Sequence, residues 1–318
     1  MDAKDKRILE ALMLNARISL TQLAKKAGVS REVASYRLKN LLKEIILGFY
    51  PVINYSALGF RRYGYFIQLK GINTKKEDEF MEYLNNHEYV SYFGPVIGRW
   101  NVVLDIIARD EKHLKIISDE IIEKFNPHVE SYLITGIGSE EEIYPTKIIG
   151  TVEKYSKKKT IAGKYVVDEL DKKILRLLSK NARIEYQELS TKLKVAANTI
   201  KYRIKNLEKT SIIEGYALSV EYTKLGLEMY TLQFKLTSSK DEKLISYLRS
   251  HKNIWFYYKY LGQETWDIGI GIIVKNHDEL RSVMIELKNN FGELIKIHDM
   301  YLVTHIIKDN IAPEGVFK

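Results

Sequence analysis

The amino-acid sequence contains two copies of one unit, and this repeat constrains the fold more than any other feature. Residues 2–41 align with residues 168–207 without a gap, and about 18 of the 40 positions are identical. The similarity resumes at the Ile-Ile-x-Gly segments that begin at Ile45 and Ile212. A chain of 318 residues therefore consists of two units of about 150 residues, each long enough for two small domains.

Each unit begins with a segment whose apolar residues recur at helical spacing, as Ile8, Leu9 and Leu12 do in the first copy. Ser19 and Ser30 are suited to cap the N-termini of two further helices, and Gly28 allows a tight turn between them. We expect the third helix to bury one stripe of apolar residues: Ala34, Leu38, Leu41, Leu42 and Ile45. Two helices joined by a tight turn, the second with a polar exposed face, indicate a helix-turn-helix.

The rest of each unit predicts a β-α-β-β-α-β order, which is the ferredoxin-like arrangement. In the first copy the elements are expected at 62–70, 75–86, 90–97, 100–108, 111–125 and 129–136. In the second copy the three best-defined strands are expected at 254–261, 266–274 and 294–303. The fold class is therefore α+β, with two tandem copies of a winged or plain helix-turn-helix domain followed by a ferredoxin-like domain.

These patterns divide the chain into five parts. We expect helix-turn-helix domains at 1–50 and 168–216, ferredoxin-like domains at 51–146 and 217–318, and a basic linker at 147–167. The formal net charge of the chain is +9. Counted by part, about +5 lies on the first helical segment, about +4 on the second and about +5 on the linker. Positive charge concentrated on these parts is the pattern of a protein that meets DNA phosphates.

Composition also excludes several kinds of site. The chain has no Cys, so it can form neither disulfides nor thiolate metal sites. Its longest apolar stretches are far shorter than the roughly 20 residues of a membrane span, and its N-terminus lacks a secretory signal. We expect a cytoplasmic protein without membrane contact. The seven histidines lack close ligand spacing, and we predict no metal, no cofactor and no catalytic residue.

Several short motifs occur at matching places in both copies. They are Asp-x-x-Asp-x-x-Ile-Leu, Asn-Ala-Arg, Tyr-Arg followed by Lys-x-Leu, and Ile-Ile-x-Gly. With these motifs the sequence resembles the Lrp/AsnC, or feast/famine, transcriptional regulators of bacteria and archaea. The resemblance covers both copies and points to the tandem archaeal type. It implies a DNA-binding helix-turn-helix joined to a ferredoxin-like domain that assembles homo-oligomers and senses an amino acid or another small metabolite.

The exposed face of the third helix is the predicted contact surface for double-stranded DNA, since the early residues of a recognition helix face base edges. It carries Arg31, Glu32, Ser35, Tyr36, Lys39 and Lys43. Lys39 and Lys43 lie farther along, where a phosphate contact is expected. Arg37 lies nearer the buried stripe, and an ion pair with an acidic residue of the first helix competes with a phosphate contact as its role.

The second helix-turn-helix departs from the first. Lys194 and Ala196 replace the turn glycine and the capping serine, and losing such a cap costs about 1 kcal/mol. The face predicted to meet DNA carries Asn198, Lys201, Tyr202 and Lys205. Either this module reads a different half-site, or it has become a structural or phosphate-only element. We favour the first hypothesis because the basic charge is retained.

The resemblance also implies an effector site at the glycine-containing turn between the two middle strands of each ferredoxin-like domain. Carried over residue by residue, it gives Gly98, Asn101, Gly262 and Asp267. Asn101 stands where the family usually has an acid, which weakens the case for the first site. A plain hairpin turn with packed tryptophans is the competing interpretation.

The predicted function is a sequence-specific, DNA-binding transcriptional regulator, modulated by a small metabolite such as an amino acid, and not an enzyme. Two alternatives remain open. Siroheme decarboxylases look like the same two-part architecture, but acting on a tetrapyrrole requires converging basic residues in a large pocket. An architectural DNA-binding protein would use the same residues without sequence preference.

Overall fold

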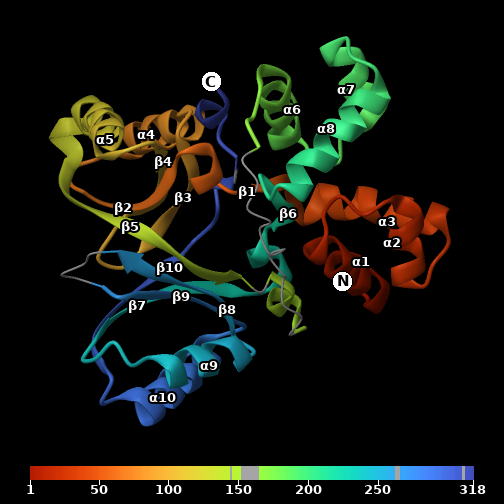
Figure 1. Cartoon of the computed structure of the whole chain (residues 1–318). Coiled ribbons are helices and arrows are strands. Elements are labelled where there is room, and N and C mark those ends of the chain that lie inside the picture. Colours follow the sequence, from red (N-terminus) through yellow and green to blue (C-terminus); the bar gives the residue numbers. More distant parts are fainter. Residues whose placement is uncertain (144, 152–164, 262–265, 310–311) are drawn as a thin grey trace.

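The computed structural model of the chain describes residues 1–143, 145–151, 165–261, 266–309 and 312–318. Each copy begins with three helices, which we call head 1 and head 2 (Figure 1). Head 1 consists of α1 (Ala3–Leu14), α2 (Leu20–Ala27) and α3 (Arg31–Glu44). Head 2 consists of α6 (Glu169–Lys180), α7 (Tyr186–Leu193) and α8 (Ala197–Lys209).

A two-stranded ribbon joins the heads. Strand β1 (Ile46–Ile53) follows head 1, strand β6 (Ile213–Val220) follows head 2, and the two pair antiparallel. Because β1 and β6 come from different copies, their backbone hydrogen bonds fix the two heads to each other as well as to the rest of the chain.

The remaining part of each copy is an αβ domain with the predicted element order. The first has β2 (Arg61–Leu69), α4 (Thr74–Asn86), β3 (Val90–Ile97), β4 (Val102–Ala108), α5 (Glu111–Phe125) and β5 (Val129–Ile143). The second has β7 (Glu228–Leu236), α9 (Glu242–Ser250), β8 (Ile254–Leu261), β9 (Ile268–Val274), α10 (His277–Phe291) and β10 (Ile295–Val303), with β11 (Lys308–Asp309) after it. Short 3-10 helices lie at Ser56–Leu58, Asn126–His128, Pro145–Ile149, Tyr222–Leu225 and Glu314–Phe317.

The two αβ domains pair within the chain, a choice that the sequence left open. Their strand orders are β5-β2-β4-β3 and β10-β7-β9-β8, and the sheets join through β5–β8 at one edge and β10–β3 at the other. The joined sheets enclose a common interior, with α4 and α5 covering one outer face and α9 and α10 the opposite one (Figure 1). The fold class is therefore confirmed as α+β, and we call the joined sheets the barrel.

Three apolar cores hold these layers. One lies between the first sheet and its helices and includes Tyr65 and Phe80. A second lies between the other sheet and its helices and includes Phe234 and Leu248. The third runs through both heads, the ribbon and the barrel interior. Since this third core is shared by both copies, the copies bury apolar surface against each other, which favours one rigid unit.

The predicted element ends agree with the structure to within one or two residues, except that β5 continues to Ile143. One prediction of burial is wrong. Leu42 is 42 % exposed, although Leu38 and Leu41 are buried as expected. The predicted stripe contains two adjacent residues near the end of α3, and a helix rotates successive side chains by about 100°. Leu42 therefore points past the core that Leu41 fills.

His87 and His251 occupy equivalent positions at the C-termini of α4 and α9, and both are buried. Each ring accepts a backbone hydrogen bond on Nδ1, from Tyr89 and Asn253 respectively, at 3.2 Å. Burial lowers the pKa of both imidazoles below 6.5. The uncharged ring is the form that can accept these bonds, so the histidines serve as neutral acceptors rather than as cations at a helix end.

We expect the free energy of unfolding to decrease as the pH falls below 6.5, because the unfolded chain then binds protons that the buried rings resist. Replacing both His87 and His251 by Gln should flatten this dependence. Denaturant unfolding between about pH 5 and 7.5 measures it. His277→Gln, at an 84 % exposed ring, is the control and should leave the slope unchanged. An equal slope in the double variant would contradict the assignment.

Candidate DNA interface and sensor turns

The turn of head 1 has the predicted chemistry. Gly28 ends α2 in the left-handed conformation, with a φ of 67°. The Ser30 hydroxyl accepts a hydrogen bond from the Val33 N–H at the start of α3. Ser19 caps α2 by accepting from the Gln22 N–H, while the Gln22 side chain contacts the serine hydroxyl and not its backbone. These caps fix where α3 begins and therefore which residues face outward.

The structure places the predicted contact residues of head 1 on α3, on the face that α1 and α2 leave open. Arg31, Glu32, Tyr36, Lys39 and Lys43 are exposed and Ser35 is half-buried. The Tyr36 ring is 67 % exposed, which is unusual for a large aromatic side chain that no partner covers. Hydrogen bonds from its own backbone N–H and from the Ser30 hydroxyl lower the pKa of Glu32. Its carboxylate is therefore partly engaged at the helix N-terminus.

Head 2 forms the same turn without the usual residues. Lys194 adopts the left-handed conformation in place of glycine, with a φ of 55°, and Ala196 supplies no side-chain cap to α8. Asn198, Lys201, Tyr202 and Lys205 are all exposed on α8, and the Tyr202 ring is 64 % exposed. The helix forms and packs against α7 and α6. Head 2 thus keeps an exposed face on α8, and its side chains differ from those of α3.

Arg37 does not join that face. Its guanidinium contacts the carboxylates of Asp2 and Asp5 at 2.8 and 2.7 Å, which ties α3 to the first turn of α1. Arg203 makes the equivalent contacts with Asp168 and Asp171 in head 2. The interpretation of Arg37 as an internal ion pair is therefore confirmed. These pairs hold each recognition helix against the first helix of its own head.

Lys147 is the first residue of the segment predicted as a basic linker, and its position was not foreseen. The side chain is buried, and its ammonium donates hydrogen bonds to backbone carbonyl oxygens at the end of α9 and the start of β8. The acceptors are Leu248, Arg249, His251 and Ile254, at 2.8 to 3.4 Å. A cation at a helix C-terminus satisfies carbonyls that lack partners. The start of the linker is therefore part of the folded second αβ domain.

The four candidate effector residues differ in what they contact. The side-chain amide oxygen of Asn101 (Oδ1) accepts the Leu69 N–H at 2.7 Å, and the Asp267 carboxylate accepts the equivalent Leu236 N–H at 2.8 Å. Asp267 also pairs with Lys235 at 3.2 Å. Each side chain thus holds its turn at the end of the neighbouring central strand. Asn101 makes the same hydrogen bond as Asp267, so the replacement of the acid by an amide keeps this contact. Gly98 has a φ of 156° and lies against the backbone of Met300, whereas Gly262 lies outside the described residues.

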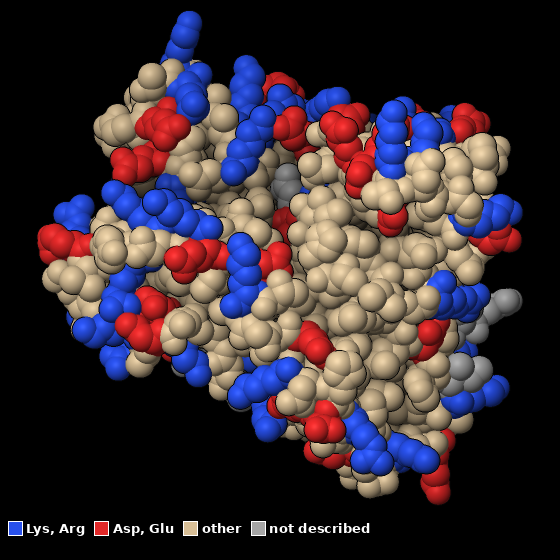
Figure 2. Space-filling model, turned by 180° about the vertical axis from the view of Figure 1, so that it is seen from behind, with Lys and Arg blue, Asp and Glu red and all other residues tan. Residues whose placement is uncertain are grey.

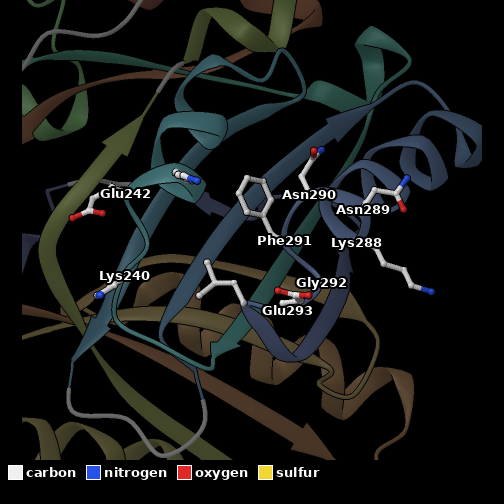
Figure 3. Close-up of a pocket in the computed structure, with 10 residues that line it drawn as sticks. Lys240, Glu242, Lys288, Asn289, Asn290, Phe291, Gly292 and Glu293 are labelled. Atoms are coloured by element: carbon white, nitrogen blue, oxygen red, sulfur yellow. The ribbon is translucent and has the colours of Figure 1, made fainter.

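A hollow of about 680 Å³ lies at the same end of the second αβ domain, between the start of α9 and the end of α10 (Figure 3). Leu294 lines it and precedes the residue of β10 that pairs with Leu236, the residue held by Asp267. Lys240, Glu242, Lys243, Lys288, Asn289, Asn290, Phe291, Gly292 and Glu293 complete the lining. Its size is that of small-ligand sites, and its lining mixes both signs of charge.

Charged side chains are unevenly distributed over the surface. Figure 2 shows Lys and Arg over the heads, and a broad area with few charges over the barrel. In the described part of the chain, no helix is long and apolar enough to cross a membrane. Nor do the described residues contain a group of three or more His, Asp or Glu arranged to hold a metal ion.

The paired heads and αβ domains define a class: helix-turn-helix proteins with a ferredoxin-like partner domain. An AsnC-type helix-turn-helix domain matches residues 1–42, and a winged helix-turn-helix DNA-binding domain matches residues 167–214. The regulatory protein AsnC of Haemophilus influenzae is 32% identical over 149 residues, which are 46% of this chain and 98% of that protein. The regulator LrpA of Pyrococcus abyssi is 31% identical over 130 residues, 41% of this chain and 89% of that protein.

The chain belongs to the Lrp/AsnC family and is a DNA-binding transcriptional regulator. Each relative spans about one copy, which agrees with the tandem arrangement. The siroheme decarboxylase NirDL is similar over 99% of this chain and 97% of its own, with a TM-score of 0.64 and 13% identity. At that identity the likeness shows a shared fold.

Lys39 and Lys205 stand at equivalent positions on α3 and α8, where phosphate contacts are expected. Replacing either by Ala should weaken binding about equally on all DNA sequences, and reduce the slope of log affinity against log salt by about 1. Fluorescence anisotropy at several salt concentrations measures both effects. Lys112→Ala, at an exposed residue of α5, is the control. A loss confined to one sequence would instead indicate base contact.

Proposed function

We propose that one chain binds one operator made of two dissimilar half-sites, with head 1 reading one and head 2 the other. The support is the pattern of difference between α3 and α8. Equivalent positions share the residues suited to phosphate and sugar, Tyr36 with Tyr202 and Lys39 with Lys205. The positions nearer the helix N-termini, which face base edges in a major groove, differ in every case.

Three replacements carry this proposal: Arg31 corresponds to Ala197, Glu32 to Asn198 and Ser35 to Lys201. An Asn side chain can bind adenine through two hydrogen bonds, whereas Arg and Lys donate to guanine. Two different donor and acceptor sets require two different base sequences. A palindromic operator would match only one of the heads.

Selection of bound sequences from random DNA tests this proposal. We expect two unlike motifs at a fixed separation, with binding at least a thousandfold tighter than to random DNA. Equal binding to all sequences, abolished by salt, would instead support the architectural alternative. Absence of DNA binding would overturn the proposal.

Giving α3 two residues of α8, by Glu32→Asn together with Ser35→Lys, should change one of the two selected motifs toward the other. Each mismatched base pair costs about 1–3 kcal/mol, so the preference for the original half-site should fall at least tenfold. The matched control is Lys39→Ala, which removes a residue common to both faces. If the double variant selects the original motif, α3 does not read bases through these positions.

We propose further that a small metabolite, such as an amino acid, binds at the turns that contain Gly98, Asn101, Gly262 and Asp267. The hollow at the strand end where Asp267 binds the Leu236 N–H supports this proposal, because its size suits such a ligand and its lining offers ammonium and carboxylate groups. Ligand binding there would change DNA affinity by a coupling free energy, reciprocally between the two sites.

Calorimetric titration with the twenty amino acids tests this proposal, and Lys288→Ala, in the lining of the hollow, should weaken any binding at least tenfold. Lys112→Ala, remote from the hollow, is the control. Heat of binding that persists in Lys288→Ala would place the ligand elsewhere. No binding by any amino acid would remove this ligand class.

We propose that the protein is not an enzyme. A decarboxylase for a tetrapyrrole needs several basic side chains free to meet carboxylates. In the αβ domains, Arg62 is 3.8 Å from Asp105, Lys235 is 3.2 Å from Asp267 and Lys259 is 3.0 Å from Asp241. Cations that already face carboxylates do not form such a site. An assay with siroheme under reducing and oxidising conditions should show no decarboxylation.

We also propose that the protein is cytoplasmic and that chains associate through their αβ domains into homo-oligomers. The broad area with few charges over the barrel in Figure 2 supports this proposal, since charged residues are depleted at the centres of interfaces. Light scattering across a range of protein concentrations measures the assembly, and the mass of a single chain at all concentrations would contradict it.

A further inference from the structure

The two heads meet through the same three residues in each copy, Asn-Ala-Arg, at 15–17 and 181–183. The Asn side chain shapes a turn in both copies. Asn15 accepts a hydrogen bond from the Arg17 N–H at 3.0 Å, and Asn181 accepts one from the Arg183 N–H at 2.9 Å. Each arginine therefore leaves its loop at a position fixed by the preceding turn.

The middle residue attaches each loop to the ribbon strand of the other copy. The Ala16 N–H donates to the Tyr216 carbonyl of β6 at 3.0 Å, and the Ala182 N–H donates to the Phe49 carbonyl of β1 at 2.8 Å. Both alanine side chains are fully buried. A larger residue at either position would push the loop away from the ribbon.

The arginines cross between the heads in both directions. The Arg17 guanidinium donates to the carbonyl oxygen of Ala182. The Arg183 guanidinium donates to the carbonyl oxygens of Ala16, at 2.5 Å, and Ile18, at 2.9 Å. Each side chain thus binds the backbone of the loop that carries the other arginine, and the contact is reciprocal.

Aromatic rings line the same crossing. The Arg17 guanidinium lies 5.0 Å from the Tyr186 ring and 5.6 Å from the Tyr216 ring, and Arg183 lies 5.4 Å from the Phe49 ring. Burial, and secondly the nearby Arg17, lower the pKa of Arg183. Two half-buried like charges are costly to bring together, so the carbonyl oxygens and ring faces must offset that cost for this arrangement to persist.

Arg17 and Arg183 are not the residues that hold each head together internally. Arg37 and Arg203 tie the recognition helices to α1 and α6 within their own heads, whereas Arg17 and Arg183 bind only across the junction in the contacts described above. The two pairs of arginines therefore separate two roles, the folding of a head and the placement of one head relative to the other.

We propose that Arg17 and Arg183 are positioning residues that fix the separation and orientation of α3 and α8, and thereby the operator spacing that the protein accepts. This inference rests on the proposed two-half-site function. Adjacent major grooves on one face of DNA recur every 10 to 10.5 base pairs. A rigid head pair meets two half-sites only at spacings that keep this phase, while a loose pair can adjust to others.

The first experiment needs no DNA. Because the chain has no Cys, spin labels can be placed uniquely at Lys26→Cys on α2 and Lys192→Cys on α7, both exposed. Pulsed electron paramagnetic resonance should give one narrow distance distribution. Adding Arg17→Ala and Arg183→Ala should broaden it at least twofold. Adding Arg37→Ala and Arg203→Ala instead, as the matched control, should leave its width unchanged.

The second experiment uses the operator obtained by selection, with its half-sites moved apart in single base-pair steps. The unmodified protein should lose at least tenfold in affinity at a half-turn displacement. The Arg17→Ala, Arg183→Ala protein should lose less than threefold while binding an isolated half-site as tightly as before. The Arg37, Arg203 control should keep the spacing preference even where its thermal stability falls.

These readouts separate the inference from the function on which it rests. Narrow distances and an unchanged spacing preference in the folded Arg17, Arg183 variant would overturn the inference while leaving DNA binding intact. No DNA binding by the unmodified protein would overturn the proposed function, and the spin-label distances would still test the junction. If the alanine variant fails to fold, Arg17→Lys with Arg183→Lys keeps the charges but loses the planar fork, and should show intermediate broadening.

Discussion

Backbone pairing between the two copies is the interaction on which the rest of the structure depends. The copies meet at the β1–β6 ribbon and at two barrel edges, β5–β8 and β10–β3. Each of these strands would otherwise present unpaired N–H and C=O groups, which are costly to bury and prone to pair with other chains. Joining the copies in one chain makes that pairing intramolecular and independent of concentration. Placement of the heads, the shared core and the Asn-Ala-Arg junction all follow from it.

A chain that carries both copies can also make them different, and the barrel interior shows where it has done so. When β2 and β7 are aligned, Phe66 of the first copy occupies the position of Gln233 in the second. Gln233 is fully buried and donates to the Tyr260 hydroxyl, which lies 3.2 Å from the Tyr258 hydroxyl. The positions equivalent to Gln233, Tyr258 and Tyr260 in the first copy are Phe66, Gly94 and Val96, which have no polar side chain. Two separate identical chains could not divide polar and apolar packing between equivalent sites in this way.

Elements with strong periodicity were predictable because their own residues determine them. Helix 111–125 and strands 90–97 and 254–261 were predicted with their observed bounds, since each has a clear cap or turn at its ends. Lys147 and Leu42 were not predictable in this way. The burial of Lys147 depends on carbonyls of residues about a hundred positions away, and no local pattern reports such a contact. The contact of Arg17 with the Ala182 carbonyl of the other copy was not predictable either. The identical Asn-Ala-Arg triplets in the two copies were the sequence feature that could have indicated it.

The segments that follow the two αβ domains also link the copies, because each carries a lysine that binds the αβ domain of the other copy. Lys147 follows the first αβ domain and binds the His251 carbonyl of the second, and Lys308 follows the second and binds the His87 carbonyl of the first, at 2.8 Å. Near the C-terminus, the Phe317 carbonyl accepts a hydrogen bond from Arg176 of α6 in head 2. Head 2 is therefore held by the C-terminal 3-10 helix (Glu314–Phe317) as well as by the ribbon. Within head 2, the ion pair between Asp168 and Arg203 joins the start of α6 to α8, so the C-terminal residues contact the helix against which α8 is held.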